Sequence, residues 1–129
     1  MSRVLQAPDW PRPAGYSHGM VAEGRIVVVG GQVGWDAQGR FAQGLAAQVG
    51  QALANIVAVV GEAGGTATSL VRLTWFVLDV DEYSRELPAI GRAYRAVLGK
   101  HFPAMSVIGV SRLVEPEALV EIEATAVVA

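Results

Sequence analysis

Apolar and polar residues alternate at the end of the chain, which predicts that its last segment is a strand. Five apolar residues at every second position share one face: Val120, Ile122, Ala124, Ala126 and Val128. The other face carries two carboxylates, Glu121 and Glu123. Strand-forming residues also follow Phe102, and an acidic turn lies around Pro116. The pattern therefore predicts a long β-hairpin that closes the chain.

A helical period marks the region from 45 to 63. Six apolar residues recur there at intervals of three and four: Leu45, Val49, Leu53, Ile56, Val60 and Ala63. The alanines between them favour a helix and allow it to pack closely on a sheet. Gly64 and Gly65 end the predicted helix, because glycine readily adopts the left-handed conformation found after a helix C-terminus.

Residues 69–80 predict a strand that is apolar on both faces, which is typical of a strand in the middle of a sheet. A second helix is predicted from 82 to 98, with Asp81 as its N-cap. Pro88 lies inside this helical pattern and predicts either a kink or a later start. Gly99 marks the end of the helix.

The first fifteen residues hold three prolines and are predicted to form an extended arm without regular structure. Strands are predicted at 16–22 and 25–29, the second of them stopping at Gly30-Gly31. Residues 32–36 are expected to continue as a loop or as an edge strand.

This order of elements predicts one α+β domain over residues 1–129, a single mixed β-sheet with two helices packed on one face. The helices would then leave the other face of the sheet uncovered. Trp75 and further apolar residues are expected on that uncovered face and would need a partner there. The pattern therefore predicts an oligomer.

The composition supports self-association. Of the 129 residues, 52% are hydrophobic but only 17% are charged, compared with about a quarter in a typical soluble domain. A small domain so poor in charge has difficulty covering its apolar surface. A compact monomer with an apolar surface is the alternative.

Charge and cysteine content narrow the function classes. The net charge is −2 and no basic cluster is present, which argues against nucleic-acid binding. The lack of cysteine excludes disulfides, thiolate catalysis and Cys-ligated zinc, and it suits a reducing cytosol. No signal-peptide pattern or membrane-length apolar run is found, so the chain is predicted to be cytoplasmic without a membrane partner. His18 and His101 lack a third ligand, so no metal site is predicted.

Segments spread over most of the chain resemble the Rid proteins, the reactive-intermediate deaminases that are also called the YjgF family. They occur in the family's order and spacing: Tyr16-Ser17-His18, Val27-Val28-Val29-Gly30-Gly31-Gln32, Gln51-Ala52-Leu53-Ala54-Asn55-Ile56, Val71-Arg72-Leu73-Thr74-Trp75-Phe76-Val77, Phe102-Pro103-Ala104 and Leu119-Val120-Glu121-Ile122-Glu123-Ala124. The resemblance implies a chorismate-mutase-like fold and a homotrimer with a small-molecule cleft at each subunit boundary.

The resemblance also implies a chemistry. The best-known members of the family hydrolyse enamines and imines to a 2-oxo acid and ammonia, without a metal or an organic cofactor. In them an arginine directly after Phe-Pro-Ala binds the substrate carboxylate. The residue that matches their water-activating glutamate is Glu121, the predicted catalytic residue. Seven residues match the pocket positions and are the predicted binding residues: Tyr16, Gly31, Gln32, Tyr94, Met105, Ser106 and Val107.

The sequence departs from the family at the arginine that binds the substrate carboxylate, here called the carboxylate clamp. Met105 stands where the arginine is expected, and it cannot form a bidentate contact with a carboxylate. An Asn-x-x-Tyr pattern begins here with Gly91, and a small polar or thiol residue is replaced by Val107. Arg92 and Arg95 are expected on the solvated side of the second helix, where only a neighbouring subunit would bring them to a cleft. Arg112 is read as a structural or rim residue.

Three functions remain open at this stage. The first is an imine or enamine hydrolase that acts on a small metabolite other than 2-aminoacrylate. The second is a trimer that binds a small molecule without chemistry. The third is a ribonuclease-type activity, against which the acidic balance argues. No cofactor is expected for any of them.

Overall fold

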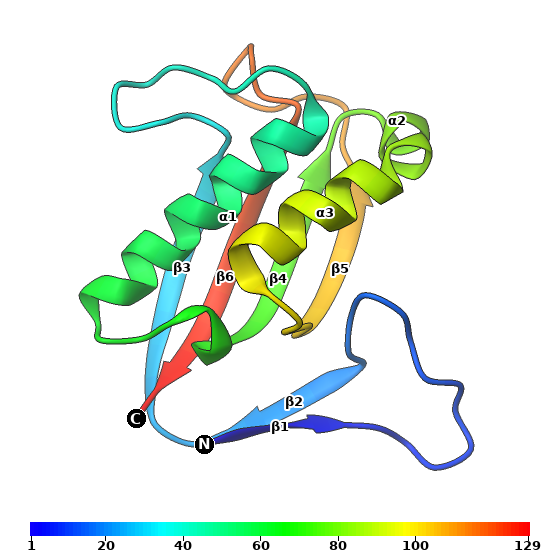
Figure 1. The fold of residues 1–129 in the computed structure, drawn as a ribbon, viewed down its shortest axis with the longest axis vertical. Helices are drawn as coiled ribbons and strands as arrows, with labels where there is room; N and C mark the ends of the chain where they lie inside the picture. The colour runs from blue at the N-terminus through cyan, green and yellow to red at the C-terminus, as the bar shows by residue number, and fades with distance from the viewer.

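The computed structural model describes residues 1–129. Its centre is a four-stranded sheet in the order β3-β6-β4-β5, in which β4 and β5 run parallel and the other pairs run antiparallel. The four strands are β3 (Arg25–Val33), β4 (Leu70–Val77), β5 (Ala104–Gly109) and β6 (Val120–Val128). The chain is thus an α+β fold with a mixed sheet, as the sequence predicts (Figure 1).

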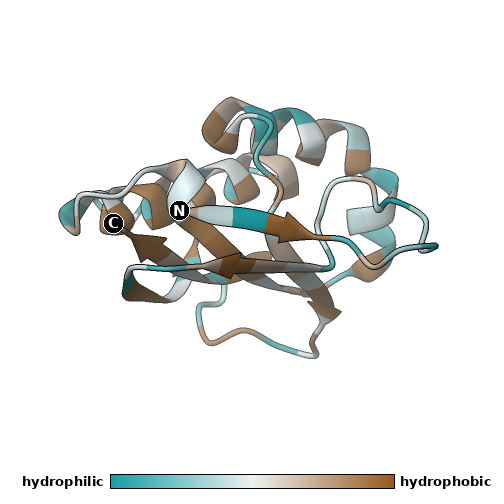
Figure 2. Ribbon diagram, turned by 90° about the horizontal axis from the view of Figure 1, so that it is seen from below, coloured by the Kyte–Doolittle hydropathy of each residue, from teal (hydrophilic) through white to brown (hydrophobic).

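Two long helices cover one face of this sheet, as Figures 1 and 2 show. Helix α1 (Leu45–Glu62) follows the predicted range closely, and Gly64 after it has a φ of 83°. The predicted second helix is divided into α2 (Val80–Arg85) and α3 (Leu87–Leu98), with Pro88 in the first turn of α3. The N-cap of α2 is Asp79, not Asp81, because Asp79 accepts a hydrogen bond from the Glu82 backbone N–H at 3.0 Å.

The core lies between the two helices and the sheet. All five alternating apolar residues of β6 are buried, as the pattern predicts. Leu53 and Ile56 of α1 are fully buried beneath them. Burying each of these two side chains contributes about 1.5–3 kcal/mol. By length and composition alone, helix α1 could cross a membrane. Core helices of globular domains meet the same criterion, and the apolar face of α1 lies against the sheet.

The predicted closing hairpin is wrong. Strand β4 lies between β5 and β6 and pairs with both, so the two arms of the expected hairpin are never adjacent. The helical segment between β4 and β5 returns the chain to the start of the sheet, which makes β5 parallel to β4. The segment after β5 then passes the end of β4, and β6 enters on the other side of it.

The predicted face of Trp75 is also wrong. Leu73, Trp75 and Val77 do share one face, but that face packs under the helices, and Trp75 is only 2% exposed. Because both faces of β4 are apolar, alternation alone does not show which face the helices cover. The face without helices instead carries two strongly exposed residues of β3, Ile26 and Val28.

The N-terminal arm contains regular structure that the sequence did not predict. Strand β1 (Ser2–Leu5) pairs antiparallel with β2 (Gly19–Ala22) in a separate two-stranded sheet. This sheet lies beyond the ends of β4 and β5 in Figure 1. A short 3-10 turn, η1 (Ala67–Ser69), precedes β4 and is closed by a capping box between Thr66 and Ser69.

Strand β3 does not stop at its paired glycines. It continues to Val33 through a shift of register between Val29 and Gln32, here called the β3 bulge. A bulge bends the strand and increases its twist. Beyond it, Asn55 of α1 donates hydrogen bonds to the backbone carbonyls of Val33 and Trp35 at 3.1 and 2.9 Å and fixes where the strand ends.

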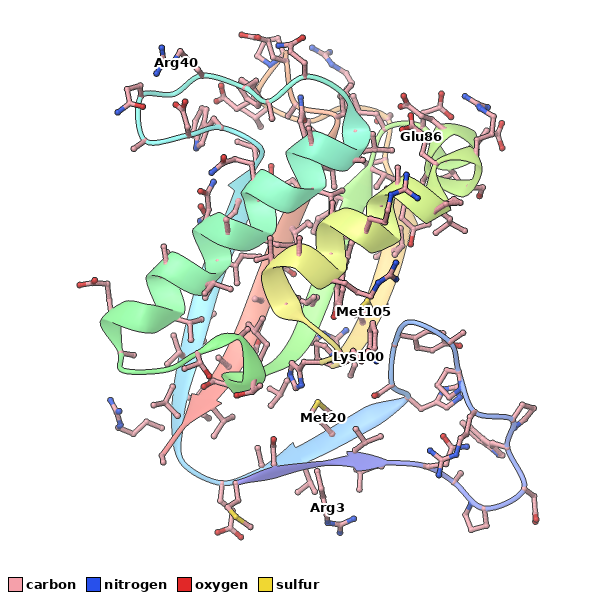
Figure 3. The ribbon with its side chains drawn as sticks, viewed as in Figure 1. Arg3, Met20, Arg40, Glu86, Lys100 and Met105 are labelled. Carbon is pink, nitrogen blue, oxygen red and sulfur yellow. The ribbon has the colours of Figure 1, made fainter.

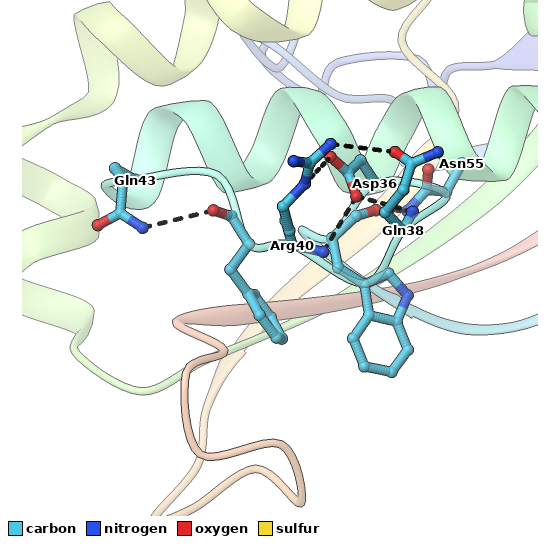
Figure 4. Close-up of polar contacts among 7 residues, drawn as sticks. Asp36, Gln38, Arg40, Gln43 and Asn55 are labelled. Carbon is cyan, nitrogen blue, oxygen red and sulfur yellow. Dashed lines mark hydrogen bonds and ion pairs between the residues drawn. The ribbon is translucent and has the colours of Figure 1, made fainter.

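The loop after β3 is held by its own turn (Figure 4). Asp36 accepts hydrogen bonds from the backbone N–H groups of Gln38 and Arg40 at 2.9 and 3.0 Å, and it pairs with the Arg40 side chain at 3.5 Å. The backbone hydrogen bond from Arg40 is the main cause that lowers the pKa of this carboxyl. The turn leads the chain back towards the start of α1.

Candidate functional site

A cavity of about 650 Å³ opens between α3, β5 and the loop before β2. It is called the α3 pocket here. Fourteen residues line it and ten of them are hydrophobic. Cavities of this size and character are typical of small-molecule sites. Met105 of β5 lies beside α3 in Figure 3 and forms part of the pocket wall.

Ser17 positions the outer wall of the pocket. Its hydroxyl donates to the Phe102 carbonyl at 2.5 Å, and its backbone N–H donates to the Pro103 carbonyl at 3.1 Å. These bonds fasten the loop before β2 to the beginning of β5. They hold Tyr16 at the pocket mouth, where its ring also meets His18 edge to face.

Three aromatic rings form a stack along one wall. Tyr94 lies parallel to Phe102 with ring centroids 5.4 Å apart, and it lies nearly parallel to Trp75 at 6.3 Å. The Tyr94 hydroxyl donates to the His101 carbonyl at 2.6 Å, so this ring offers its surface to the pocket while its polar end is already bonded. Burial raises the pKa of Tyr94 above its usual value. His101 in turn bonds to the Leu70 carbonyl at 2.7 Å.

One donor in this wall has no partner. The indole N–H of Trp75 is buried and makes no hydrogen bond within the chain. Most buried polar atoms in proteins are hydrogen-bonded, and an indole N–H can only donate. The indole N–H of Trp75 is therefore an unsatisfied donor enclosed within the pocket wall.

Arg95 is exposed, as expected for the solvated side of its helix, but it also contributes to the pocket. It lines the α3 pocket of its own chain, so no neighbouring subunit is needed to bring it there. It makes no ion pair or side-chain hydrogen bond with the rest of the chain. Arg92, three residues before it, is exposed on α3 and is not part of the pocket wall.

The β3 bulge gathers the remaining predicted residues. The carboxylate of Glu121 lies directly over Gly31, where a side chain carbon built on Gly31 would be 2.1 Å from the Glu121 Oε2 atom. Only glycine leaves room for this approach. Gln32 lies beside them on the same bulge, and its side-chain amide donates to the Gly30 carbonyl at 3.2 Å.

The sheet separates these two groups within one chain. Met105 pairs with Leu73, which faces the helices, whereas Glu121 pairs with Phe76 on the opposite face. Paired residues on adjacent strands point to the same side. Strand β4 also lies between β5 and β6, so two inter-strand spacings, or about 10 Å, separate them across the sheet. The Glu121 carboxylate and the α3 pocket therefore do not meet in a single chain.

Five of the predicted residues line the α3 pocket: Tyr16, Tyr94, Met105, Ser106 and Val107. The other three, Gly31, Gln32 and Glu121, lie together at the β3 bulge. Sequence reasoning did not assign pocket roles to Arg95, Trp75 or Phe102. The helical spacing of Arg95 from Gly91 was a usable signal, because residues four apart share one face of a helix. No group of three or more potential ligand side chains is placed to hold a metal ion.

The fold and the pocket define a small α+β domain with a ligand-sized cavity between its last helix and the edge of its sheet. Comparison with protein families gives a match to Endoribonuclease L-PSP over residues 8–128. The chain therefore belongs to this family, whose members include proteins described as Rid and YjgF.

Individual relatives agree with this assignment. The chain is 33% identical to the 2-iminobutanoate/2-iminopropanoate deaminase of Salmonella typhimurium and 31% identical to a RutC family protein of Haemophilus influenzae, covering 98% of each chain. Among solved structures, a Rid family protein of unknown function, YyfB from Yersinia pestis, is 37% identical with a TM-score of 0.85 and 98% coverage of both chains. The YjgF gene product of E. coli is 31% identical with a TM-score of 0.70, covering 97% of this chain and 98% of that one.

Proposed function

We propose that this protein is an imine or enamine hydrolase that works as a homotrimer, with each site shared between two subunits. The α3 pocket of one chain would hold the substrate. The β3 bulge of the next chain would supply Glu121. The relatives named as 2-iminobutanoate/2-iminopropanoate deaminases support the reaction class.

The separation of Glu121 from the α3 pocket carries this proposal. The α3 pocket lies on the helix-covered side of the sheet and contains no carboxylate. The Glu121 carboxylate lies on the opposite side of the sheet, away from this pocket. Strands β3 and β5 are both edge strands, and one flanks the bulge while the other flanks the pocket. Edge strands with exposed apolar residues such as Val28 and Ile108 favour association with further copies of a chain. Head-to-tail contact between unlike edges forms a ring when the rotation between copies closes, and a rotation of about 120° gives a trimer.

The reaction balances with one water and one general base. Glu121 accepts a proton as the water oxygen bonds to the imine carbon, and the C=N double bond becomes a single bond. Transfer of that proton to nitrogen gives a carbinolamine, which carries a hydroxyl and an amino group on the same carbon. The hydroxyl proton then passes through Glu121 to the amino group, so that ammonia is the leaving group. The carbon–nitrogen bond then breaks, the carbonyl forms, and the products are a 2-oxo acid and ammonia. The step needs neither an oxidant nor a metal.

The substrate is expected to differ from 2-aminoacrylate. The family's carboxylate clamp directly follows Phe-Pro-Ala, and this position is Met105 in an apolar wall. A methionine side chain gives the pocket contact area but no charge-assisted hydrogen bond.

Imines generated by an amino-acid oxidase test the reaction. Their hydrolysis is followed as the release of 2-oxo acid or ammonia, with and without the purified protein. We expect acceleration by the wild-type chain and a loss of about 100- to 10,000-fold in Glu121→Gln. Glu123→Gln is the matched control, because Glu123 is exposed and lies two residues along the same strand. An undiminished rate in Glu121→Gln would refute the proposal.

Sedimentation analysis tests the assembly. A trimer is expected at micromolar concentration. Val28 is 76% exposed on the face of the sheet that has no helices. The Val28→Arg variant places a charge on this face and should shift the population towards monomer. A wild-type chain that remains monomeric would contradict the shared site.

A trimer that binds a small molecule without turning it over is the second candidate, and Met105 at the clamp position favours it. Stabilisation by 2-oxo acids in a thermal-shift experiment, together with no turnover of any imine, would select this function. Nucleic-acid cleavage is not favoured by the pocket, because its single cation and apolar wall do not suit a polyanion.

A further inference from the structure

We infer that Arg95 binds the substrate carboxylate in this protein, and that the substrate is a 2-imino acid with a large apolar or aromatic side chain. This assignment rests on the proposed function and names the substrate class of the same site. It moves the anion-binding role from strand β5 to helix α3.

The geometry of Gly91 and Arg95 supports this role. The two residues are one helical turn apart on α3, and both line the α3 pocket. A side chain carbon built on Gly91 would be 3.1 Å from the Arg95 Nη1 atom. The guanidinium therefore lies over the glycine, in space that a larger residue at 91 would occupy. Because Gly91 has no side chain, the Arg95 guanidinium can occupy this position beside the pocket.

The charges around the pocket also support a carboxylate-binding role for Arg95. Arg95 is the only charged residue among the fourteen that line the cavity. No acidic side chain pairs with it anywhere in the chain. A planar guanidinium with free donors suits a carboxylate, which it can bind through two parallel hydrogen bonds. A cation near a helix C-terminus also interacts favourably with the helix dipole, but that effect does not predict a ligand.

The other walls set the size and polarity of the substrate. Ile90, Met105 and the aromatic stack surround the cavity, and they offer apolar area well beyond what a three- or four-carbon imine would cover. An aromatic substrate side chain would gain contact with the aromatic residues that line the cavity. These features predict selection of large 2-imino acids over small ones.

Product analogues test the assignment by isothermal titration calorimetry on the full chain. Phenylpyruvate carries both proposed features. Pyruvate lacks the aromatic group, and phenylacetone has a methyl group in place of the carboxylate. We expect phenylpyruvate to bind at least about tenfold more tightly than either of the other two.

Arg95→Met is expected to weaken phenylpyruvate binding by about 10- to 100-fold and to leave phenylacetone binding unchanged. Arg92→Met is the matched control, since it removes the same charge from the same helix outside the pocket wall. It should bind both compounds as the wild type does. Equal phenylpyruvate affinity in Arg95→Met and wild type, equal affinity for pyruvate and phenylpyruvate, or no binding of any 2-oxo acid would each overturn the inference.

The catalytic role of Glu121 and the binding role of Arg95 are tested by separate variants. If Glu121→Gln abolishes imine hydrolysis while Arg95→Met leaves phenylpyruvate binding intact, the reaction stands and the role of Arg95 is wrong. If Arg95→Met weakens binding while Glu121→Gln does not alter turnover, the pocket assignment stands and the proposed mechanism is wrong.

Discussion

The α3 pocket and the β3 bulge carry different kinds of residues. The pocket is apolar and aromatic with one cation, Arg95, whereas the bulge presents glycine backbone, an amide and the carboxylate of Glu121. They also differ in their resemblance to the Rid pattern. The bulge keeps Gly31, Gln32 and Glu121, while the pocket has Met105 and Gly91 at positions where the pattern has polar residues.

The main difference is that the bulge keeps Glu121, the predicted catalytic residue, whereas the pocket lacks the carboxylate-binding arginine of the Rid pattern. Residues that act on water and the imine carbon do not depend on the rest of the substrate, so they can stay fixed. Residues that bind the carboxylate and the side chain determine which substrate enters. The deaminase activity for which some relatives are named therefore informs the reaction of this chain more directly than it informs the substrate.

The sharpest way to disturb only the bulge is Gly31→Ala. Its new methyl group would lie 2.1 Å from the Glu121 carboxylate and must displace it. Misplacement of a catalytic group by about 1 Å can cost about 100-fold in rate, and we expect a loss of that order in imine hydrolysis. Gly30→Ala is the matched control, because nothing lies within 4 Å of its added carbon. Equal rates in the two variants would show that the position of Glu121 is unimportant.

Met105→Arg reverses the main departure at the pocket. It should strengthen pyruvate binding by about tenfold, because a second guanidinium reaches a small carboxylate near β5. Phenylpyruvate should lose its advantage as the apolar wall is removed. The half-buried site makes this change cost about 1–3 kcal/mol of stability. Calorimetry and urea denaturation measure the two effects, and unchanged pyruvate affinity would show that position 105 does not contact the ligand.

Tyr94→Phe tests the support beneath the aromatic stack. It removes the hydrogen bond to the His101 carbonyl and should cost about 1 kcal/mol in the free energy of unfolding. Burial raises the folded-state pKa of Tyr94 above 10.0, so its contribution to stability is full below pH 10 and is lost as the pH rises through that higher pKa. The wild type should therefore lose stability above pH 10 more steeply than Tyr94→Phe does. Identical pH slopes in denaturation curves would contradict this cause.

Gly91→Ala should have the smallest effect. Alanine stabilises a helix by about 1 kcal/mol relative to glycine, and its methyl group would displace the Arg95 guanidinium slightly. We expect higher thermal stability and a two- to threefold loss of phenylpyruvate affinity, roughly the effect of one weakened contact. Gly61→Ala in α1 provides a comparison, because nothing lies within 4 Å of its added carbon. An affinity loss in Gly61→Ala as well would assign the effect to the helix and not to Arg95.

The hydrophobic pattern of the sequence correctly predicted elements that are determined by neighbouring residues, such as helix α1 and strand β6. The period of α1 and the alternation of β6 are properties of neighbouring residues, and both were read correctly. Strand order is not such a property, so β5 and β6 looked like a hairpin although β4 lies between them. The same limit applies to Trp75, because a strand that is apolar on both faces does not reveal which face the helices cover.

The site was only partly predictable for a similar reason. The family resemblance supplied Met105 and Glu121, but sequence spacing does not show that they lie on opposite faces of the sheet. Arg95 was predicted on the solvated side of its helix and is exposed there, but its place in the pocket wall was not predicted. Its role in the pocket depends on how α3 is rotated over β5, and on the space above Gly91, which only the three-dimensional arrangement shows.

Mixed oligomers test most directly whether each site is shared between subunits. Glu121→Gln keeps its pocket but lacks the base, and Val107→Trp keeps the base but fills its pocket. Each should be inactive alone. When the two are co-expressed in equal amounts, about a quarter of the sites combine an intact pocket with an intact glutamate from the next chain. We predict recovery of about a quarter of wild-type imine hydrolysis. A mixture no more active than its two components would contradict a site shared between chains.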